Sequence, residues 1–278
     1  MKRLINHMKN IVQRFREHRL NAASAHAAFF IMLSFIPCII LLFSLLQFTE
    51  IQKIDVLRFV QGVVPTQMLV FFTGIVGEAY NKTPTAVSLS ALATMWSAGR
   101  GMMALTQGLQ GIAGIREERN YFAVRFRATV YTVILLLSII IFLLLGVFGN
   151  ALLEMITMKI PLMAYVAELI VDVKNVFLLL FATVIFALIY RFMPGNSMPL
   201  GAHLPGAALC SVGWFVYSYA FSVYVDKFSG FANMYGSLTT IILIMLWLYF
   251  GMYITLIGAE VNQMLSEREK ISEKREKT

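Results

Sequence analysis

The chain has 278 residues, of which 59% are hydrophobic and only 14% charged, and its formal net charge is +8. A soluble domain carries about 25% charged residues, so this chain has too little charge to cover the surface of a soluble fold. The same numbers exclude intrinsic disorder, a collagen-like chain and a small disulfide scaffold, and they predict a polytopic membrane protein.

The N-terminal residues 2–19 predict a basic amphipathic helix. Apolar side chains recur at helical spacing on one face, and six Lys and Arg residues lie around the rest. Such a helix suits the anionic headgroups at the cytoplasmic surface of a membrane. Packing of the helix on the protein's own cytoplasmic face is the alternative.

Six segments are long and apolar enough to cross a hydrocarbon core about 30 Å thick as helices. They are residues 25–48, 86–109, 128–152, 173–193, 204–225 and 237–259. Transmembrane strands are excluded, because the segments are too long and do not alternate. We therefore expect an all-α fold with six transmembrane helices and short interfacial amphipathic helices. A single membrane domain would cover 1–262, and a charged tail would follow over 263–278.

The distribution of positive charge predicts the orientation of these helices. Lys174 and Arg191, near the ends of the fourth span, are counted with the loops beside them. If both termini are cytoplasmic, the cytoplasmic segments then hold sixteen of the 23 Lys and Arg residues and the external segments hold six. The remaining one, Arg100, lies within the second span. We therefore expect cytoplasmic termini. Lipid, with anionic headgroups at that face, is then the expected partner, and the net charge needs no nucleic acid.

A shorter apolar run lies between the first two spans. It opens at Pro65 and ends near Ala79, which is too short to cross a membrane. Its apolar residues share one helical face: Met68, Leu69, Phe72, Ile75 and Val76. The run predicts a short helix that either re-enters the membrane at its outer side or caps the protein there.

Arg100 is the most informative residue, because a charge within a span is rare and usually functional. Its guanidinium either reaches the headgroups, pairs with a carboxylate such as that of Glu260, or binds the phosphate or carboxylate of an anionic substrate. Ser97 and Thr94 lie on the same span and would line a polar groove beside it. Small residues at this spacing also indicate close helix packing, which is the alternative.

Two prolines are expected kinks or breaks, Pro37 in the first span and Pro205 at the start of the fifth. The two cysteines, Cys38 and Cys210, also lie within predicted spans and are expected to be buried free thiols. Small residues spaced along the fifth span, from Gly206 to Cys210, predict close packing against another helix.

Signatures of catalysis are absent from the sequence. The four histidines are scattered without metal-ligand spacing, and no Walker loop, GxSxG or GxGxxG is present. We therefore expect no enzymatic activity, no metal and no cofactor.

Several segments together resemble the YihY/BrkB-like family of bacterial inner-membrane proteins, over about residues 22–262. They include AAFFIMLSFIP (27–37), WSAGRGMMAL (96–105), YRFMP (190–194) and LIGAEVN (256–262). The resemblance implies a six-helix protein of the bacterial cell membrane. Members have been labelled ribonuclease BN, a name generally regarded as a misassignment, and some relatives are connected with lipid or lipopolysaccharide export. The chain departs from the family at Gln110 and Gly111, which weakens any role for the side chain of Gln110.

Three functions from different classes are compatible with these residues. The polar second span and the external amphipathic helix favour a transporter or flippase-like protein for an anionic amphiphile. The alternative is a non-catalytic scaffold or envelope-assembly protein, which would act as a homo-oligomer or with envelope partner proteins. An intramembrane or RNA-processing enzyme has the least support.

Overall fold

The computed structural model describes residues 13–46, 52–63, 69–80, 84–138, 174–227 and 237–276. These residues form helices and turns without any strand, which confirms the all-α fold class for this part of the chain. They divide into two compact units. Unit 1 comprises residues 1–108, 118–129 and 215–254, and unit 2 comprises residues 109–117, 130–214 and 255–278.

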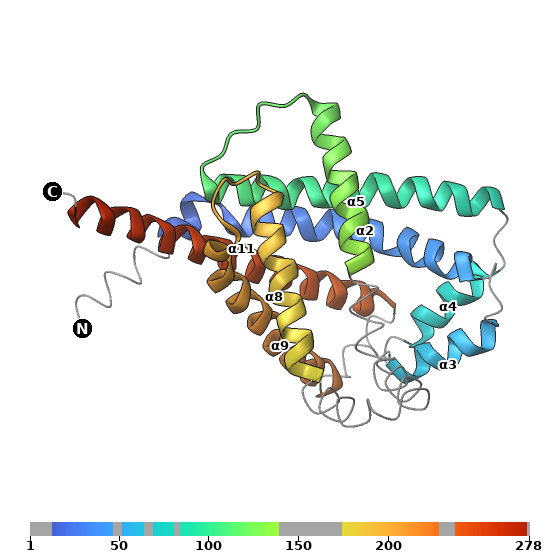
Figure 1. Cartoon of the computed structure of the whole chain (residues 1–278). Coiled ribbons are helices and arrows are strands. Elements are labelled where there is room, and N and C mark those ends of the chain that lie inside the picture. Colours follow the sequence, from blue (N-terminus) through green and yellow to red (C-terminus); the bar gives the residue numbers. More distant parts are fainter. Residues whose placement is uncertain are drawn as a thin grey trace, which may run out of the picture. The chain divides into compact units, whose positions relative to one another are not determined.

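The helices follow the apolar segments of the sequence. They are α2 (Leu20–Leu46), α3 (Lys53–Val63), α4 (Leu69–Ala79), α5 (Pro84–Ala113), α8 (Lys174–Phe192), the 3₁₀ helix η3 (Leu200–His203), α9 (Leu204–Lys227) and α11 (Ser237–Glu276) (Figure 1). A further helix covers Tyr121–Ser138. Each of the six predicted spans therefore coincides, wholly or in its described part, with a helix.

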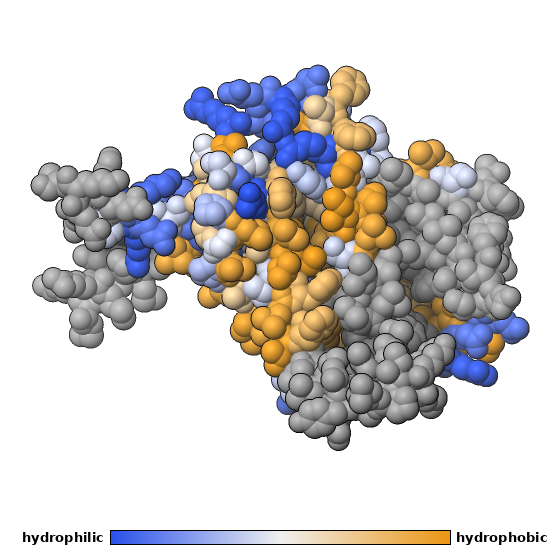
Figure 2. Space-filling view, viewed as in Figure 1, coloured by the Kyte–Doolittle hydropathy of each residue, from blue (hydrophilic) through white to orange (hydrophobic). Residues whose placement is uncertain are grey.

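Three of these helical segments are long and apolar enough to cross a membrane: Tyr121–Ser138, Leu200–Val225 and Leu238–Ser272. Shorter apolar helices cover Leu20–Ser34, Leu69–Glu78 and Val176–Phe192. The membrane class is thereby supported, whereas the number of six transmembrane helices stays a prediction. Figure 2 shows hydrophobic surface over α8, which exposes Phe177 and Leu180. Apolar side chains on an outer surface are typical of a protein that faces lipid.

Unit 1 begins with a break between two helical segments. Residues 13–17 are helical, but Arg19 adopts a φ of 49°, which interrupts the helix before α2 starts at Leu20. Residues 2–12 of the predicted amphipathic helix lie outside the described residues. In the core of this unit, Ala28 and Met32 of α2 pack against Ile244 and Leu248 of α11.

The short helices α3 and α4 form a pair beside α2 (Figure 1). Val56 and Val60 of α3 are buried against Val76 of α4, with Leu69 and Phe72 packed around them. The predicted short amphipathic helix is therefore present in its described part, from Leu69 to Ala79, and residues 65–68 of the prediction lie outside the described residues. Its partner α3 was not predicted from the sequence.

Unit 2 is built around a close crossing of α9 and α11. A Cβ on Gly206 would lie under 3.0 Å from the carbonyl oxygen of Gly258 and from the side chain of Asn262. The backbones therefore touch, as expected where small residues face each other between membrane helices. This confirms the packing predicted from Gly206 to Cys210, and Cys210 is a buried free thiol as expected. The side chain of Cys38 lies outside the described residues.

The predicted kinks can now be placed on their helices. α2 continues through Pro37 as one helix, so the helix is not broken there, and a kink at Pro37 stays a prediction. Pro205 is the second residue of α9, directly after η3, and thus occupies the first turn, where a missing N–H is tolerated. It marks the junction of the two helices and does not interrupt α9. The tail from residue 263 continues α11 as a helix to Glu276.

Two glycine turns end α5 and α8. Gly114 and Gly195 have φ values of 67° and 77°, in the left-handed region that favours glycine. After each, the next N–H donates back to a carbonyl five residues earlier: Ile115 to Gln110 and Asn196 to Arg191. These bonds cap the helix ends in the Schellman manner. The second turn directs the chain from α8 towards η3.

Candidate functional site

α5 brings Trp96 and Arg100 onto one helical face, because residues four apart lie about one turn apart. Next to them, a Cβ on Gly101 would lie 2.8 Å from Cγ1 and 3.0 Å from the backbone N of Ile31. α5 therefore approaches the backbone of α2 at Gly101. This contact places Arg100 beside Phe30 of α2.

Phe30, Trp96, Arg100 and Arg125 form what we call the arginine–tryptophan cluster of unit 1. The Cζ of Arg125 lies 4.5 Å from the centroid of the Trp96 ring. The Cζ of Arg100 lies 5.8 Å from the same ring and 5.5 Å from the ring of Phe30. Each of these distances is within the range of a cation–π interaction, worth about 0.5–1 kcal/mol at an exposed site.

The two guanidinium groups of the cluster differ in how they are held. Arg125 donates to the carbonyl oxygen of Trp96 at 2.5 Å and to the Sδ of Met103 at 3.6 Å, and it lies against Gly99. Its orientation is thus fixed on α5. Arg100 is exposed, and its contacts among the described residues are with the aromatic rings.

Of the other residues predicted to form a polar site, only Ser97 has its side chain described in the same unit as Arg100. Ser97 is half-buried and adjacent to Trp96 on α5, while the side chain of Thr94 lies outside the described residues. Glu260 is fully buried and belongs to unit 2. Its pairing with Arg100 stays a prediction. The structure instead shows Arg100 in contact with the aromatic rings of Phe30 and Trp96, which were not predicted from the sequence as its partners.

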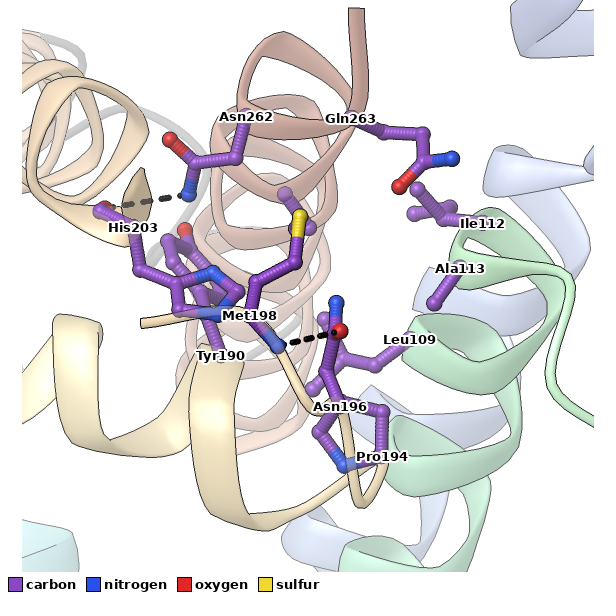
Figure 3. A pocket seen from close by; sticks show the side chains of 11 residues that line it. Leu109, Ile112, Ala113, Tyr190, Pro194, Asn196, Met198, His203, Asn262 and Gln263 are labelled. Carbon is purple, nitrogen blue, oxygen red and sulfur yellow. Dashed lines mark hydrogen bonds between the residues drawn. The ribbon is translucent and has the colours of Figure 1, made fainter. Parts of the chain in front are cut away.

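A second polar site lies in unit 2, around a cavity of about 20 Å³ (Figure 3). Its lining comes from the end of α5, the end of α8 with the following turn, η3 and α11. The polar lining residues are Tyr190, Asn196, His203, Asn262 and Gln263. His203 is only 2% exposed. Within the part of the chain that the structure describes, neither of its ring nitrogens has a hydrogen-bond partner.

Asn262 fixes the wall of this cavity. Its Nδ2 donates to the carbonyl oxygen of His203 at 3.0 Å, and its Oδ1 accepts from the N–H of Gly206 at 2.7 Å. One buried amide thereby joins α11 both to η3 and to the first turn of α9. These bonds hold the backbone of His203 in place while its ring faces the cavity (Figure 3).

A polar network next to the cavity links three helices through Thr255 of α11. Tyr190 of α8 donates to the Thr255 carbonyl oxygen at 2.7 Å, and Trp214 of α9 donates to the Thr255 hydroxyl at 3.1 Å. Cys210 approaches the same hydroxyl at 3.9 Å. Buried polar groups between membrane helices are costly unless they are paired, so this network specifies how α8, α9 and α11 pack. Among the described residues, no group of three His, Cys, Asp or Glu side chains could hold a metal ion.

The fold and these sites define a helical membrane protein with polar groups inside its helix packing. The chain belongs to the family described as virulence factor BrkB, whose pattern matches residues 11–278. This result confirms the family resemblance identified in the sequence.

Individual relatives match along most of their length. A Bacillus subtilis protein named as ribonuclease-like, YfkH, is 26% identical over 276 residues, covering 95% of this chain and 96% of its own. A UPF0761 membrane protein of Vibrio parahaemolyticus is 25% identical over 276 residues, covering 95% and 83%. Another from Aeromonas salmonicida is 26% identical over 278 residues, covering 92% and 88%. No solved structure matches the chain.

Proposed function

We propose that this protein binds an anionic amphiphile at the arginine–tryptophan cluster and moves it across the bacterial cell membrane, as a transporter or flippase-like protein. The observation that carries the proposal is the exposed guanidinium of Arg100, which contacts the rings of Phe30 and Trp96, while a second guanidinium, that of Arg125, contacts the same Trp96 ring. A guanidinium presents a planar fork of donors that matches a phosphate or carboxylate. The ligand would be a lipid or a related molecule with such a group.

The two arginines would have different roles in this site. Arg125 is bonded to α5 and holds the Trp96 ring by stacking on it, so it positions the ring and contributes charge. Arg100 would contact the anionic group itself. Trp96 is 57% exposed, and its indole suits the boundary between headgroups and acyl chains. The cluster thus offers a cationic and an apolar surface to the same ligand.

Retention of lipid by the purified protein tests the binding step. The protein would be purified in nanodiscs, and the retained anionic lipids would be measured by mass spectrometry for wild type, Arg100→Gln and Arg125→Gln. A charge-assisted pair is worth about 1.5–3 kcal/mol, which corresponds to an affinity lower by a factor of about 10–100 for Arg100→Gln.

Arg58→Gln is the matched control, because Arg58 is an arginine of α3, 74% exposed and 3.8 Å from Asp55. We expect it to retain as much anionic lipid as wild type. Equal retention by Arg100→Gln would contradict the binding site.

A second assay separates transport from binding. Proteoliposomes with fluorescent phosphatidylglycerol or phosphatidylcholine would report movement of each lipid between leaflets, and we expect faster movement of the anionic probe. Lipid binding without movement would favour the alternative, a non-catalytic scaffold for envelope assembly. Neither function requires catalysis by the chain. The word ribonuclease belongs to the name of the Bacillus relative.

A further inference from the structure

The cavity in unit 2 is lined by a polar ring that is almost fully buried. His203 is buried, and its ring faces the cavity between Tyr190 and Met198 (Figure 3). A neutral imidazole has one donor and one acceptor nitrogen, and both are unpaired among the described residues. Burial of such groups without partners is unfavourable, so the fold holds His203 there against a cost.

The volume and the lining of the cavity identify the ligand that would pair with the ring. About 20 Å³ exceeds the 10–15 Å³ or so that one water molecule requires, but it leaves no room for an organic ligand. The other lining groups are the amides of Asn196, Asn262 and Gln263, the phenol of Tyr190 and apolar side chains. This neutral lining contains no carboxylate, so it suits water better than a metal cation.

Several titratable or charged side chains lie on the helices that surround the His203 ring. From α8, Tyr190 lines the cavity and Arg191 interacts electrostatically with His203. On α11 the carboxyl of Glu260 is buried next to the lining residue Ala259, and on α9 the thiol of Cys210 is buried, but neither residue lines the cavity. The end of α5 and the turn after α8 contribute no titratable group to the lining. Histidine is the side chain among these whose ordinary titration falls near neutral pH.

We propose that His203 and its cavity form a proton-binding site, in which one bound water molecule hydrogen-bonds to the imidazole and exchanges a proton with it. On protonation, hydronium gives its proton to the free ring nitrogen and becomes water, and no other bond changes. The site would let this unit respond to a proton, which is a function independent of the arginine–tryptophan cluster. Ionisable groups within membrane helix bundles serve proton transfer in other transport proteins.

Nuclear magnetic resonance of a single-histidine protein tests this proposal directly. His7, His18 and His26 would be changed to Gln, which leaves His203 as the only ¹⁵N-labelled histidine in full-length protein in nanodiscs. We expect its ring nitrogen signals to follow a one-proton titration curve as the pH is lowered from about 8 to 4. Signals that stay constant over this range would overturn the proposal.

Two further variants separate the proton site from a structural role. Ala113→Val, made in the single-histidine protein, would fill part of the cavity and displace the water, and we expect its titration curve to shift or vanish. An unchanged curve would overturn the role of the cavity. In the otherwise native chain, the difference in Tm between wild type and His203→Gln should vary with pH. A difference independent of pH would mean that the ring is only a packing element.

Discussion

The crossing of α9 and α11 allows a stability prediction with a defined size. In Gly206→Ala, the new methyl group would lie under 3.0 Å from the carbonyl oxygen of Gly258 and from Asn262. A backbone carbonyl cannot turn aside as a flexible side chain can, so the two helices must separate. Their separation also weakens the 2.7 Å bond from the Gly206 N–H to Asn262.

The expected magnitude follows from these two losses. Overpacking of a tight contact costs about 1–3 kcal/mol. A hydrogen bond between membrane helices contributes about 0.6 kcal/mol on average and up to about 1.7 kcal/mol. We therefore expect Gly206→Ala to lower the free energy of unfolding by about 2–4 kcal/mol, although alanine is the better helix former.

Gly111→Ala provides a control of opposite sign. Gly111 also lies in a helix of unit 2, but nothing is within 4 Å of the position that its Cβ would take. Alanine should stabilise this helix by up to about 1 kcal/mol. Reversible unfolding by dodecyl sulfate in mixed micelles, followed by tryptophan fluorescence, would measure both variants. If Gly206→Ala were as stable as Gly111→Ala, the close approach of the two helices would be refuted.

Three other outcomes can be tested independently. Asn262→Ala removes both hydrogen bonds that join α11 to η3 and α9. It should lower the free energy of unfolding by about 1–3 kcal/mol in the same micelle assay, and the control Gln263→Ala should lower it much less. Tyr190→Phe removes the hydroxyl that donates to Thr255 and should cost about 0.5–1.5 kcal/mol, and a neutral result would show that this bond contributes nothing net. Reporter fusions at the two termini should both give the cytoplasmic signal, since sixteen of the 23 basic residues then face the cytoplasm; an external signal at one end would imply an odd number of spans.

The apolar runs predicted the helices well, because a membrane helix must satisfy its backbone internally and therefore shows its length in the sequence. The short helix α3 was missed for the opposite reason. It carries Lys53, Asp55 and Arg58, and its buried face has only Val56 and Val60 at helical spacing. Such a face becomes visible only when its partner α4 is known.

The candidate sites were predicted less completely. Arg100 was identifiable because a charge stands out within a span, but its neighbours come from far along the chain. Arg125 bonds to a residue 29 positions away, and Phe30 belongs to another helix. Trp96, four residues before Arg100, was the available signal. His203 gave none, since its burial depends on the Gly195 turn and on Asn262, which is 59 positions away.

The amide of Asn262 also limits how this part of the molecule can move. It bonds at once to the carbonyl of His203 and to the N–H of Gly206, while Gly258 touches the backbone opposite. Sliding of α11 along α9 by one turn would break both bonds together and bring larger side chains into the contact. Shear between these two helices is therefore disfavoured. In any conformational change, α9 and α11 would move together as one rigid body at this crossing, and the hinges would lie in other segments.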